Sequence, residues 1–427
     1  MQHATANEHN AAQPETTHKH RYHLWPGVRG VPLACNGPKP NQISQLLPSE
    51  IDFFRVQCNA TEDGGVFMRA VERTLRGTLS CAPKNLVRME KVQLHGLGAT
   101  LHTLIKPLMY AYAHEKSLLT PPLPELASPA DCRDGLSCYL QPLSICDKPA
   151  AQLAWKQPRR FEDIEVLVGA AEPGGRWAHN MSEKKQNERG QAPEVGWFKF
   201  VATLLAYIMH PATGSVEREL NMALERTGLG RARERGPVIG LHVRRGDACR
   251  PIEIELTGRK CEPLELYMNR VRQLKRDSST PVSTIYLATD DRHVIDEARA
   301  KYSDEFTILH YGVSLEANLR VNPTGILWEE SLAKARQHRD FDALSRLTTT
   351  NLVDVLLLSR CDLLVGKHTS TYFRMAFELR AARCDCLAPF VSIDSSAWCF
   401  DWGVRAGAIG PEGRAWHGLA KPMQLVC

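Results

Sequence analysis

Two adjacent arginines stand at the end of an apolar run in the stretch "GPVIGLHVRRGDACR", residues 236–250. The run Val238–Val243 has the composition of a buried strand, which places Arg244 and Arg245 at its carboxyl end. Side chains alternate across a strand, so His242 and Arg244 share one side of it. Because a guanidinium group recognises phosphate with a planar fork, two neighbouring arginines suit a diphosphate.

Asp247 follows these arginines and could pair with one of them, which would fix that side chain. The alternative is an ordinary ion pair at the surface end of a strand, with no ligand. This stretch alone does not separate the two interpretations.

A second polar stretch, "GKHTST", also follows an apolar run. Ser370 and Thr371 lie where a strand is expected to turn into a helix. Unpaired backbone N–H groups at a helix start, with hydroxyls beside them, bind anions. The alternative is a simple helix N-cap.

Three further acidic residues are candidates for a functional site. Asp354 lies on an apolar helix face, "LVDVLLL", where a carboxylate is costly unless it is satisfied. It could accept two N–H bonds from a guanine edge, or it could be a buried acid bonded to nearby hydroxyls. Asp290 and Asp291 end the stretch "YLATDD", which suggests metal binding, sugar contact or helix capping.

The turn "GLGATL" carries Gly96 and Gly98 but has Leu101 where a dinucleotide fingerprint needs its third glycine. A lone GxG is weak evidence for an NAD enzyme. It fits better as a close backbone approach to a phosphate from an opposite domain.

The elements that must position these residues alternate along the second half of the chain. Strands are expected at 237–243, 283–291, 306–312 and 362–367, and helices at 263–277, 292–302, 351–361 and 372–382. This alternation predicts an α/β fold with a doubly wound parallel sheet. Ligands of such sheets bind at the carboxyl ends of the strands, which is where "HVRRGD", "ATDD" and "GKHTST" fall.

The first half is less regular. Residues 1–45 are polar and suggest a flexible stem, and residues 171–191 suggest an exposed loop. Residues 91–119 predict a short strand, a glycine turn and a helix, whereas 136–147 resembles a strand. The stretch 197–228 predicts two helices, broken at Pro211 and ending near Gly228.

Composition limits the class of protein. The chain has 427 residues, 43% hydrophobic and 24% charged, which suggests a soluble globular protein with two domains. A net charge of +5 does not by itself support nucleic-acid binding.

Thirteen cysteines include no CxxC pair, so zinc-site spacing is lacking. Cys249 and Cys261 flank one polar loop, and three others cluster in a second: Cys132, Cys138 and Cys146. This arrangement favours disulfides formed in an oxidising compartment, with buried free thiols as the alternative. Glycosylation sequons at Asn59 and Asn180 add a little weight.

Targeting is ambiguous. The sequence suggests no transmembrane helix, and its polar N-terminus does not read as a signal peptide. We favour a luminal protein whose anchor is absent from this chain, and a cytosolic protein is the alternative.

The motifs "GLGATLHTLIKPLMYAYA", "VIGLHVRRGD", "YLATDD" and "LVDVLLLSRCDLLVGKHTST", in this order, resemble the α-1,6-fucosyltransferase family. The family includes animal enzymes that fucosylate the N-glycan core and rhizobial enzymes that act on chitin oligosaccharides. The likeness runs from about residue 92 to about residue 404.

The resemblance implies a two-domain GT-B-type glycosyltransferase that uses GDP-fucose, inverts the anomeric carbon and needs no metal or other cofactor. We expect a flexible segment 1–45, an acceptor-side α/β domain 46–232 and a Rossmann-like GDP-fucose-binding domain 233–427. The partners implied are GDP-fucose and an oligosaccharide or glycoprotein acceptor, and the compartment implied is the Golgi or secretory-pathway lumen.

The family's site residues transfer by position. His242 and Asp354 match the positions that read guanine, and Arg244 and Arg245 match the arginines on the diphosphate. The remaining matches are the phosphate-binding turn, the glycine turn over the nucleotide and the paired acids, at Ser370 and Thr371, Gly96 and Gly98, and Asp290 and Asp291. The family usually has an amide where Thr371 stands.

Three departures affect the expected reaction. Ala248 stands where the animal enzymes have a lysine, and the following loop is longer. A glutamate soon after that lysine serves as base in the family, so the resemblance makes Glu253 the candidate base, with Glu255 next. The C-terminal SH3-like domain and the N-terminal coiled coil of the animal enzymes are not evident. The expected activity is fucosyl transfer to a GlcNAc-containing glycan, in α-1,6 linkage to an N-glycan core. Alternatives are a chitin-like or protein acceptor, or a catalytically degenerate GDP-fucose- or glycan-binding protein.

Overall fold

The computed structural model describes residues 85–89, 96–113, 116–127, 135–144, 196–210, 214–251, 260–277, 281–321, 328–384 and 390–393, with residues 75, 92, 132, 146, 254, 403–404 and 425–426. The expected stem, the polar loop 171–191 and both sequons lie outside these residues.

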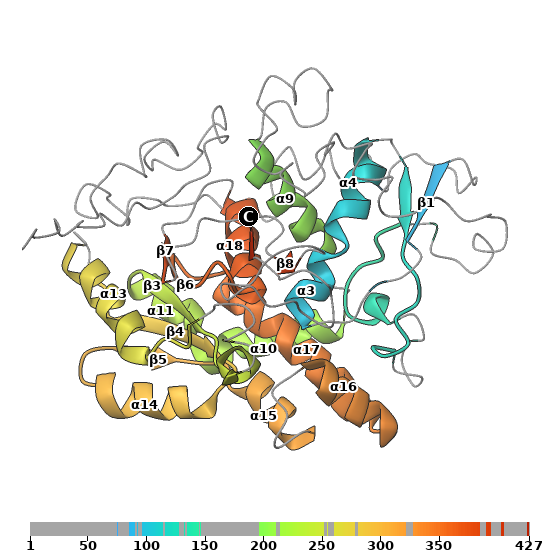
Figure 1. Cartoon of the computed structure of the whole chain (residues 1–427). Coiled ribbons are helices and arrows are strands. Elements are labelled where there is room, and N and C mark those ends of the chain that lie inside the picture. The colour runs from blue at the N-terminus through green and yellow to red at the C-terminus, as the bar shows by residue number, and fades with distance from the viewer. Residues whose placement is uncertain are drawn as a thin grey trace, which may run out of the picture.

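A five-stranded sheet occupies the second half of the chain (Figure 1). Its strands are β3 (Val238–Val243), β4 (Thr284–Thr289), β5 (Thr307–Leu309), β6 (Leu363–Gly366) and β7 (Phe390–Ser392). The order is β5-β4-β3-β6-β7, and every neighbouring pair is parallel. The predicted α/β class with a parallel sheet is confirmed. The first four strands were expected from the sequence, and β7 was not.

β3 is the central strand, and all six of its residues are buried. Strands β4 and β5 follow on one side of β3, and β6 and β7 follow on the other. The order in which the chain adds strands to the sheet therefore reverses at β3, while all strands stay parallel. Gly240 fits this crowded position because an added Cβ would lie only 2.8–2.9 Å from side-chain atoms of Leu364, Cys361 and Leu358.

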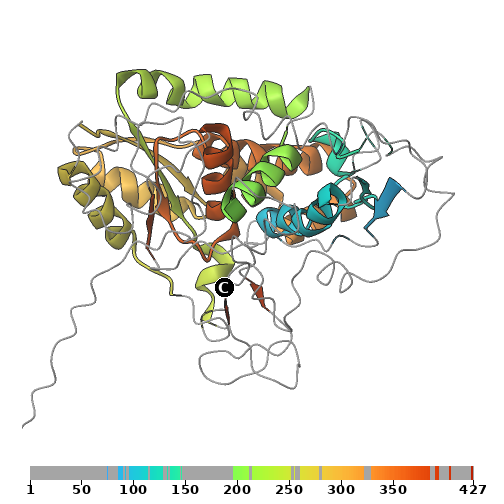
Figure 2. The same cartoon turned by 90° about the horizontal axis from the view of Figure 1, so that it is seen from above.

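Four predicted helices pack around the sheet: α13 (Leu264–Asp277), α14 (Arg292–Tyr302), α17 (Phe341–Leu358) and α18 (Thr371–Cys384). The buried side chains of α13 and α14 share one apolar cluster with β3, whereas those of α17 and α18 belong to a second, larger cluster. Figures 1 and 2 show α18 between the sheet and the helices of the first half.

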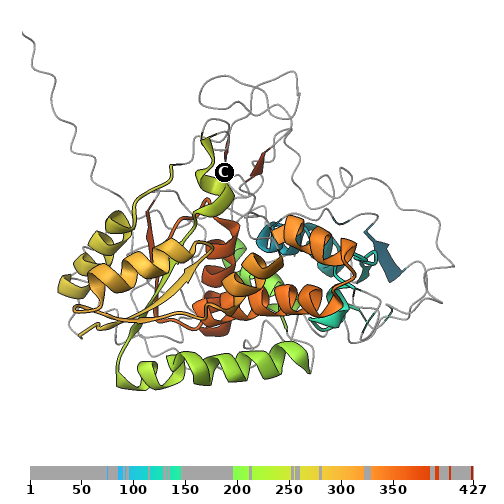
Figure 3. The ribbon, with the colours of Figure 1, turned by 90° about the horizontal axis from the view of Figure 1, so that it is seen from below.

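The first half contributes a parallel strand pair and several helices. The strands are β1 (Leu86–Arg88) and β2 (Ser117–Leu119), and the helices are α3 (Leu97–His102), α4 (Ile105–Ala113), α9 (Gly196–Ile208), α10 (Ser215–Thr227) and α11 (Leu229–Arg235). The predicted break near Pro211 is confirmed, and α10 ends at Gly228 in the left-handed region (φ 68°). Figure 3 shows α10 and α11 in succession along one side of the molecule, leading into β3.

Two local predictions were wrong. The stretch 136–147 contains no continuous strand in its described part but a 3₁₀ turn, η3 (Leu136–Cys138). Gly135 (φ 76°) and the Cys132–Cys138 disulfide fold this segment locally, which overrides its strand-like composition. The expected glycine turn at Gly96 and Gly98 is instead the start of α3, in which Gly96 is the N-cap and Gly98 is a helical residue packed against the start of α18.

Two helices were missed in the sequence, α15 (Val313–Val321) and α16 (Trp328–Gln337). Short strands β8 (Gly403–Val404) and β9 (Leu425–Val426) were missed as well.

The predicted domain boundary at 232/233 lies within a continuous core. The larger cluster contains Leu101 and Leu205 from one side of it and Leu357 and Phe377 from the other. Helix α18 packs on both α3 and α9. The two-domain division and the Rossmann-like description therefore stay predictions.

Candidate active site

The carboxyl ends of β3, β4 and β6 adjoin one another because β3 pairs with both other strands. Val243 lies opposite Thr289, so Arg244 and Asp290 both come one residue past the paired strands. Thr289 Oγ1 donates to the Val243 carbonyl at 2.7 Å and closes the end of the pair. The three polar stretches identified in the sequence thus converge at one edge of the sheet.

Asp290 accepts hydrogen bonds from both arginines. Its Oδ2 accepts a hydrogen bond from Arg244 Nη1, and its Oδ1 accepts from the backbone N–H of Arg245 at 2.7 Å. The Arg244 and Asp290 side chains are 30% and 21% exposed. Asp247 was the expected partner, but its side chain lies outside the described part, and Asp290 makes this pair.

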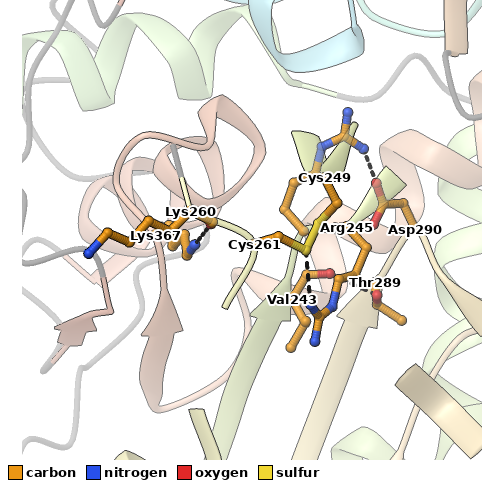
Figure 4. The surroundings of a disulfide bond; sticks show 9 residues. Val243, Arg245, Cys249, Lys260, Cys261, Thr289, Asp290 and Lys367 are labelled. Carbon is orange, nitrogen blue, oxygen red and sulfur yellow. Dashed lines mark hydrogen bonds and ion pairs between the residues drawn. A yellow bond between two sulfur atoms is a disulfide. The ribbon is translucent and has the colours of Figure 1, made fainter. Parts of the chain in front are cut away.

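Arg245 has a different environment (Figure 4). Its Nη1 donates to Cys261 Sγ at 3.0 Å, and Cys261 forms a disulfide with Cys249. The expected disulfide chemistry is present: Cys249 bonds to Cys261 across the polar loop, and within the cluster of three cysteines Cys132 bonds to Cys138. A disulfide therefore contacts Arg245, one of the candidate site residues.

His242 is buried, with 4% of its surface exposed. Its ring stacks on Tyr372 with centroids 5.3 Å apart, and its Nδ1 has no partner among the described atoms. Burial, with Arg244 nearby, lowers the pKa of His242 to about 3. The imidazole is therefore neutral at physiological pH and able to bond a ligand edge.

Asp354 is a buried acid surrounded by hydroxyls, as one of the two sequence interpretations held. Tyr286 donates to its Oδ1 at 2.5 Å, and Tyr372 and Ser314 donate to its Oδ2 at 3.3 and 3.4 Å. Burial raises the pKa of Asp354 to about 6, and these hydrogen bonds oppose the rise. The hydroxyls do not use every acceptor position of a carboxylate, so the guanine assignment stays a prediction.

The two tyrosines were missed in the sequence. Tyr286 lies in a buried strand and Tyr372 in the first turn of α18. A tyrosine within an apolar run was the available signal, because a buried tyrosine hydroxyl generally has a hydrogen-bonding partner such as a buried carboxylate.

The start of α18 faces the same region. The Ser370 carbonyl accepts from Arg374 N at 3.1 Å, so Ser370 immediately precedes the helix. Thr371 Oγ1 accepts from Arg374 Nη2 at 3.1 Å. The first N–H groups of a helix have no intrahelical acceptor, which gives this end the character of an anion site.

Gly98 brings α3 against this helix start. A Cβ at Gly98 would lie 3.1 Å from Met375 Sδ and 3.2 Å from the backbone nitrogen of Tyr372. The close approach here is therefore to protein backbone. Gly96 is exposed, and a Cβ there would meet nothing within 4 Å.

The other acids separate. Asp291 caps α14 by accepting from His293 N at 2.9 Å, so its capping alternative is observed. Glu253 and Glu255 lie outside the described residues. Within the described residues no group of three or more His, Cys, Asp or Glu side chains could hold a metal ion, and none of the helices described there could cross a membrane.

Comparison with known proteins finds a matching family over part of the chain. A sequence model described as "Alpha-(1,6)-fucosyltransferase N- and catalytic domains" matches residues 189–324, which include both arginines and Asp290. The resemblance to the α-1,6-fucosyltransferase family is confirmed. The alpha-(1,6)-fucosyltransferase of Drosophila melanogaster is 29% identical over 191 residues, which cover 44% of this chain and 25% of that protein. The match thus spans about a quarter of that relative.

The solved structures that align with this chain have lower sequence identity. NodZ alpha-1,6-fucosyltransferase soaked with GDP-fucose aligns over 69% of this chain and 91% of its own, with 16% identity and a TM-score of 0.38. POFUT1 in complex with GDP-fucose aligns over 73% of this chain and 98% of its own, with 14% identity and a TM-score of 0.41.

Proposed function

We propose that this chain is an inverting fucosyltransferase that moves fucose from GDP-fucose to a GlcNAc-containing glycan. The observation that carries the proposal is the family match over residues 189–324, which covers the paired arginines at the end of β3. The α-1,6 linkage and the N-glycan core as acceptor are the finer parts of the proposal. A chitin-like oligosaccharide or a protein is the alternative acceptor.

The donor diphosphate binds between the arginines and the start of α18. Negative charge develops on the β-phosphate as GDP leaves the sugar. Arg244 and Arg245, with the N–H groups near Ser370 and Thr371, stabilise that charge without a metal ion. The order of magnitude is about 3 kcal/mol of barrier for one such contact.

Guanine binds beside the buried pair His242 and Asp354. The neutral imidazole has an unpaired Nδ1, and the Asp354 carboxylate retains acceptor capacity. The α3 start at the exposed Gly96 covers the nucleotide, and Gly98 allows α3 to pack against the start of α18 that binds the diphosphate. Asp290 positions the arginines. Glu253, or else Glu255, removes the proton from the acceptor hydroxyl on the face opposite the diphosphate.

We further propose the domain division 46–232 and 233–427, with a Rossmann-like second domain, and a luminal, Golgi location. The continuous parallel sheet of the second half and the reversal at β3 support the first. The Cys132–Cys138 and Cys249–Cys261 disulfides support the second, because such bonds persist in oxidising compartments.

A glycan array with GDP-fucose as donor tests the function, with fucose incorporation read by mass spectrometry. Incorporation at the innermost GlcNAc of an N-glycan supports the full proposal, and incorporation only into chitin oligosaccharides replaces the acceptor. GDP binding with no incorporation and no GDP-fucose hydrolysis would favour the second candidate, a degenerate binding protein, which the replacement of a family lysine by Ala248 suggests.

A further inference from the structure

Both halves of the Cys249–Cys261 disulfide contact Arg245 (Figure 4). Cys261 Sγ accepts from the Arg245 guanidinium at 3.0 Å, and the backbone N–H of Cys249 donates to the Arg245 carbonyl at 3.1 Å. Arg245 is thereby held at its side chain and its main chain by two residues that are 12 positions apart in sequence but covalently joined. The main-chain bond belongs to the local turn that includes the 3₁₀ element Gly246–Cys249, whereas the guanidinium contact with Cys261 exists because the disulfide brings Cys261 beside that turn.

A buried lysine, Lys367, contacts the chain beside Cys261. Lys367, at the end of β6, donates from Nζ to the carbonyl of Lys260, the residue before Cys261. The lysine is only 7% exposed. Because β6 flanks β3 on the side away from β4, this contact ties the Cys261 end of the disulfide to a different strand from the one that carries Asp290.

The chemistry of the Arg245 contact suits a ligand-binding side chain. Disulfide sulfur is a weak acceptor, and among the described residues Cys261 Sγ is the only side-chain acceptor for the Arg245 guanidinium. A phosphate oxygen is a far stronger acceptor for an arginine. A phosphate oxygen would therefore replace the sulfur contact at little cost, while the disulfide keeps Cys261 packed beside the guanidinium.

We propose that the Cys249–Cys261 disulfide and Lys367 form one positioning element for Arg245, and so make donor diphosphate binding depend on the redox state of this disulfide. The inference rests on the proposed function, in which Arg245 binds the diphosphate. Reduction by a dithiol gives two protein thiols and one reagent disulfide, and frees Cys261 from Cys249. Among the described contacts, the Lys367 hydrogen bond and the Arg245 contact with Cys261 Sγ then remain at the Lys260–Cys261 segment, without the covalent bond.

The test is calorimetric titration of GDP into the whole chain, oxidised and reduced, with near-UV circular dichroism to verify that each form is folded. Reduction is expected to weaken GDP binding about tenfold. The Cys249→Ser/Cys261→Ser variant should show the same loss without reductant. Its matched control, Cys132→Ser/Cys138→Ser, removes the other described disulfide and should bind GDP as the wild type does.

The decisive arm repeats these titrations in an Arg245→Ala background. If the disulfide acts through Arg245, reduction there should change GDP binding less than about twofold. Lys367→Met should weaken binding in the native background, and Lys367→Arg should restore it, because arginine can still donate to the Lys260 carbonyl. An equal loss on reduction with and without Arg245 would overturn the inference and leave the disulfide a merely structural bond.

Failure of the inference and failure of the proposed function give different results. Oxidised wild type that binds GDP, with no change on reduction and none in Lys367→Met, rejects the positioning element alone. Oxidised wild type that binds no GDP rejects the proposed function and the inference with it. Lys367→Met and reduced wild type keep the test valid if the double serine variant does not fold.

Discussion

The guanidinium groups of the two neighbouring arginines at the end of β3 have different hydrogen-bond acceptors. Arg244 pairs with a carboxylate, Asp290, which itself comes from the adjacent strand β4. Arg245 rests against a disulfide sulfur, which is a weak acceptor on a covalently closed segment. Asp290 also binds the backbone N–H of Arg245, so the difference lies in the guanidinium groups, of which one contacts a carboxylate and the other a disulfide.

This difference predicts different duties. A guanidinium already paired with a carboxylate brings less unsatisfied charge to a ligand but is held firmly in one orientation. A guanidinium with a weak partner keeps its charge available. We expect Arg244 to set the geometry of the diphosphate and Arg245, whose guanidinium has only a weak acceptor, to supply more of the charge that stabilises departing GDP.

The largest effect should come from the general base, which the proposal places in the segment closed by the disulfide on the Arg245 side. Glu253→Gln should lower fucosyl transfer on the order of 10³-fold and leave GDP affinity unchanged, because a base acts on the acceptor. Transfer rates and GDP titrations of Glu253→Gln and Glu255→Gln should be measured in parallel. Loss only at Glu255 would move the base by two residues, and full activity in both would place it elsewhere.

Arg244→Ala should reduce transfer at least about 10²-fold, roughly 3 kcal/mol in the barrier, because it removes an oriented charge from the leaving group. The exposed Arg276 of α13 offers a control, since Arg276→Ala removes equal charge far from the β3 end. A folded Arg244→Ala variant with wild-type turnover would reject the diphosphate assignment.

Titration of the buried Asp354 should make the free energy of unfolding depend on pH. The pKa of Asp354 is about 6 in the folded protein and near 3.8 when exposed, because burial disfavours its charge. Asp354 therefore favours the folded state at low pH, and this contribution is lost as pH rises from about 4 to about 6. The expected change is on the order of 2 kcal/mol.

Denaturant unfolding from pH 4 to 7 measures this change, with Asp354→Asn as the variant that cannot titrate. Asp304→Asn is the matched control, because Asp304 is exposed. Identical pH slopes for wild type and Asp354→Asn would mean that Asp354 does not titrate in this window.

Asp290→Asn should have a smaller effect, about tenfold on transfer, because asparagine can still accept from the backbone N–H of Arg245 while losing the ion pair to Arg244. The result sharpens the comparison if the Arg244→Ala/Asp290→Asn double variant is no worse than Arg244→Ala. Additive losses in that double variant would show that Asp290 acts on something other than Arg244.

Chelation should have no effect. If the arginines and the α18 N-terminus stabilise the leaving group, transfer survives EDTA at the wild-type rate. A rate that collapses with EDTA and returns with manganese would assign a metal role to Asp290 and Asp291.

The sequence was most informative where strands end. Apolar runs followed by "HVRRGD", "ATDD" and "GKHTST" predicted both the strands and their convergence, because parallel strands present their carboxyl ends at one edge. Asp290 as the partner of Arg244 could not be predicted, since it depends on the register that sets Val243 opposite Thr289. The hydroxyls around Asp354 come from three separate elements and leave no local pattern.

Errors arose where tertiary contacts override local pattern. "GLGATL" has the composition of a turn, yet Gly98 permits a helix to pack on the backbone of Tyr372. The strand-like residues after Gly135 fold into a 3₁₀ turn beside the Cys132–Cys138 disulfide. In both places the deciding contact lies with residues distant from the local window or with a covalent bond.

The most direct test of the account is calorimetric titration of GDP, in the presence of EDTA, into the oxidised wild-type chain and the Arg244→Ala/Arg245→Ala variant. The account predicts saturable one-to-one binding by the wild type and at least about a 10²-fold weaker affinity in the folded double variant. Equal affinity in the two proteins, or no binding by the wild type, would contradict the claim that the end of β3 is a nucleotide diphosphate site.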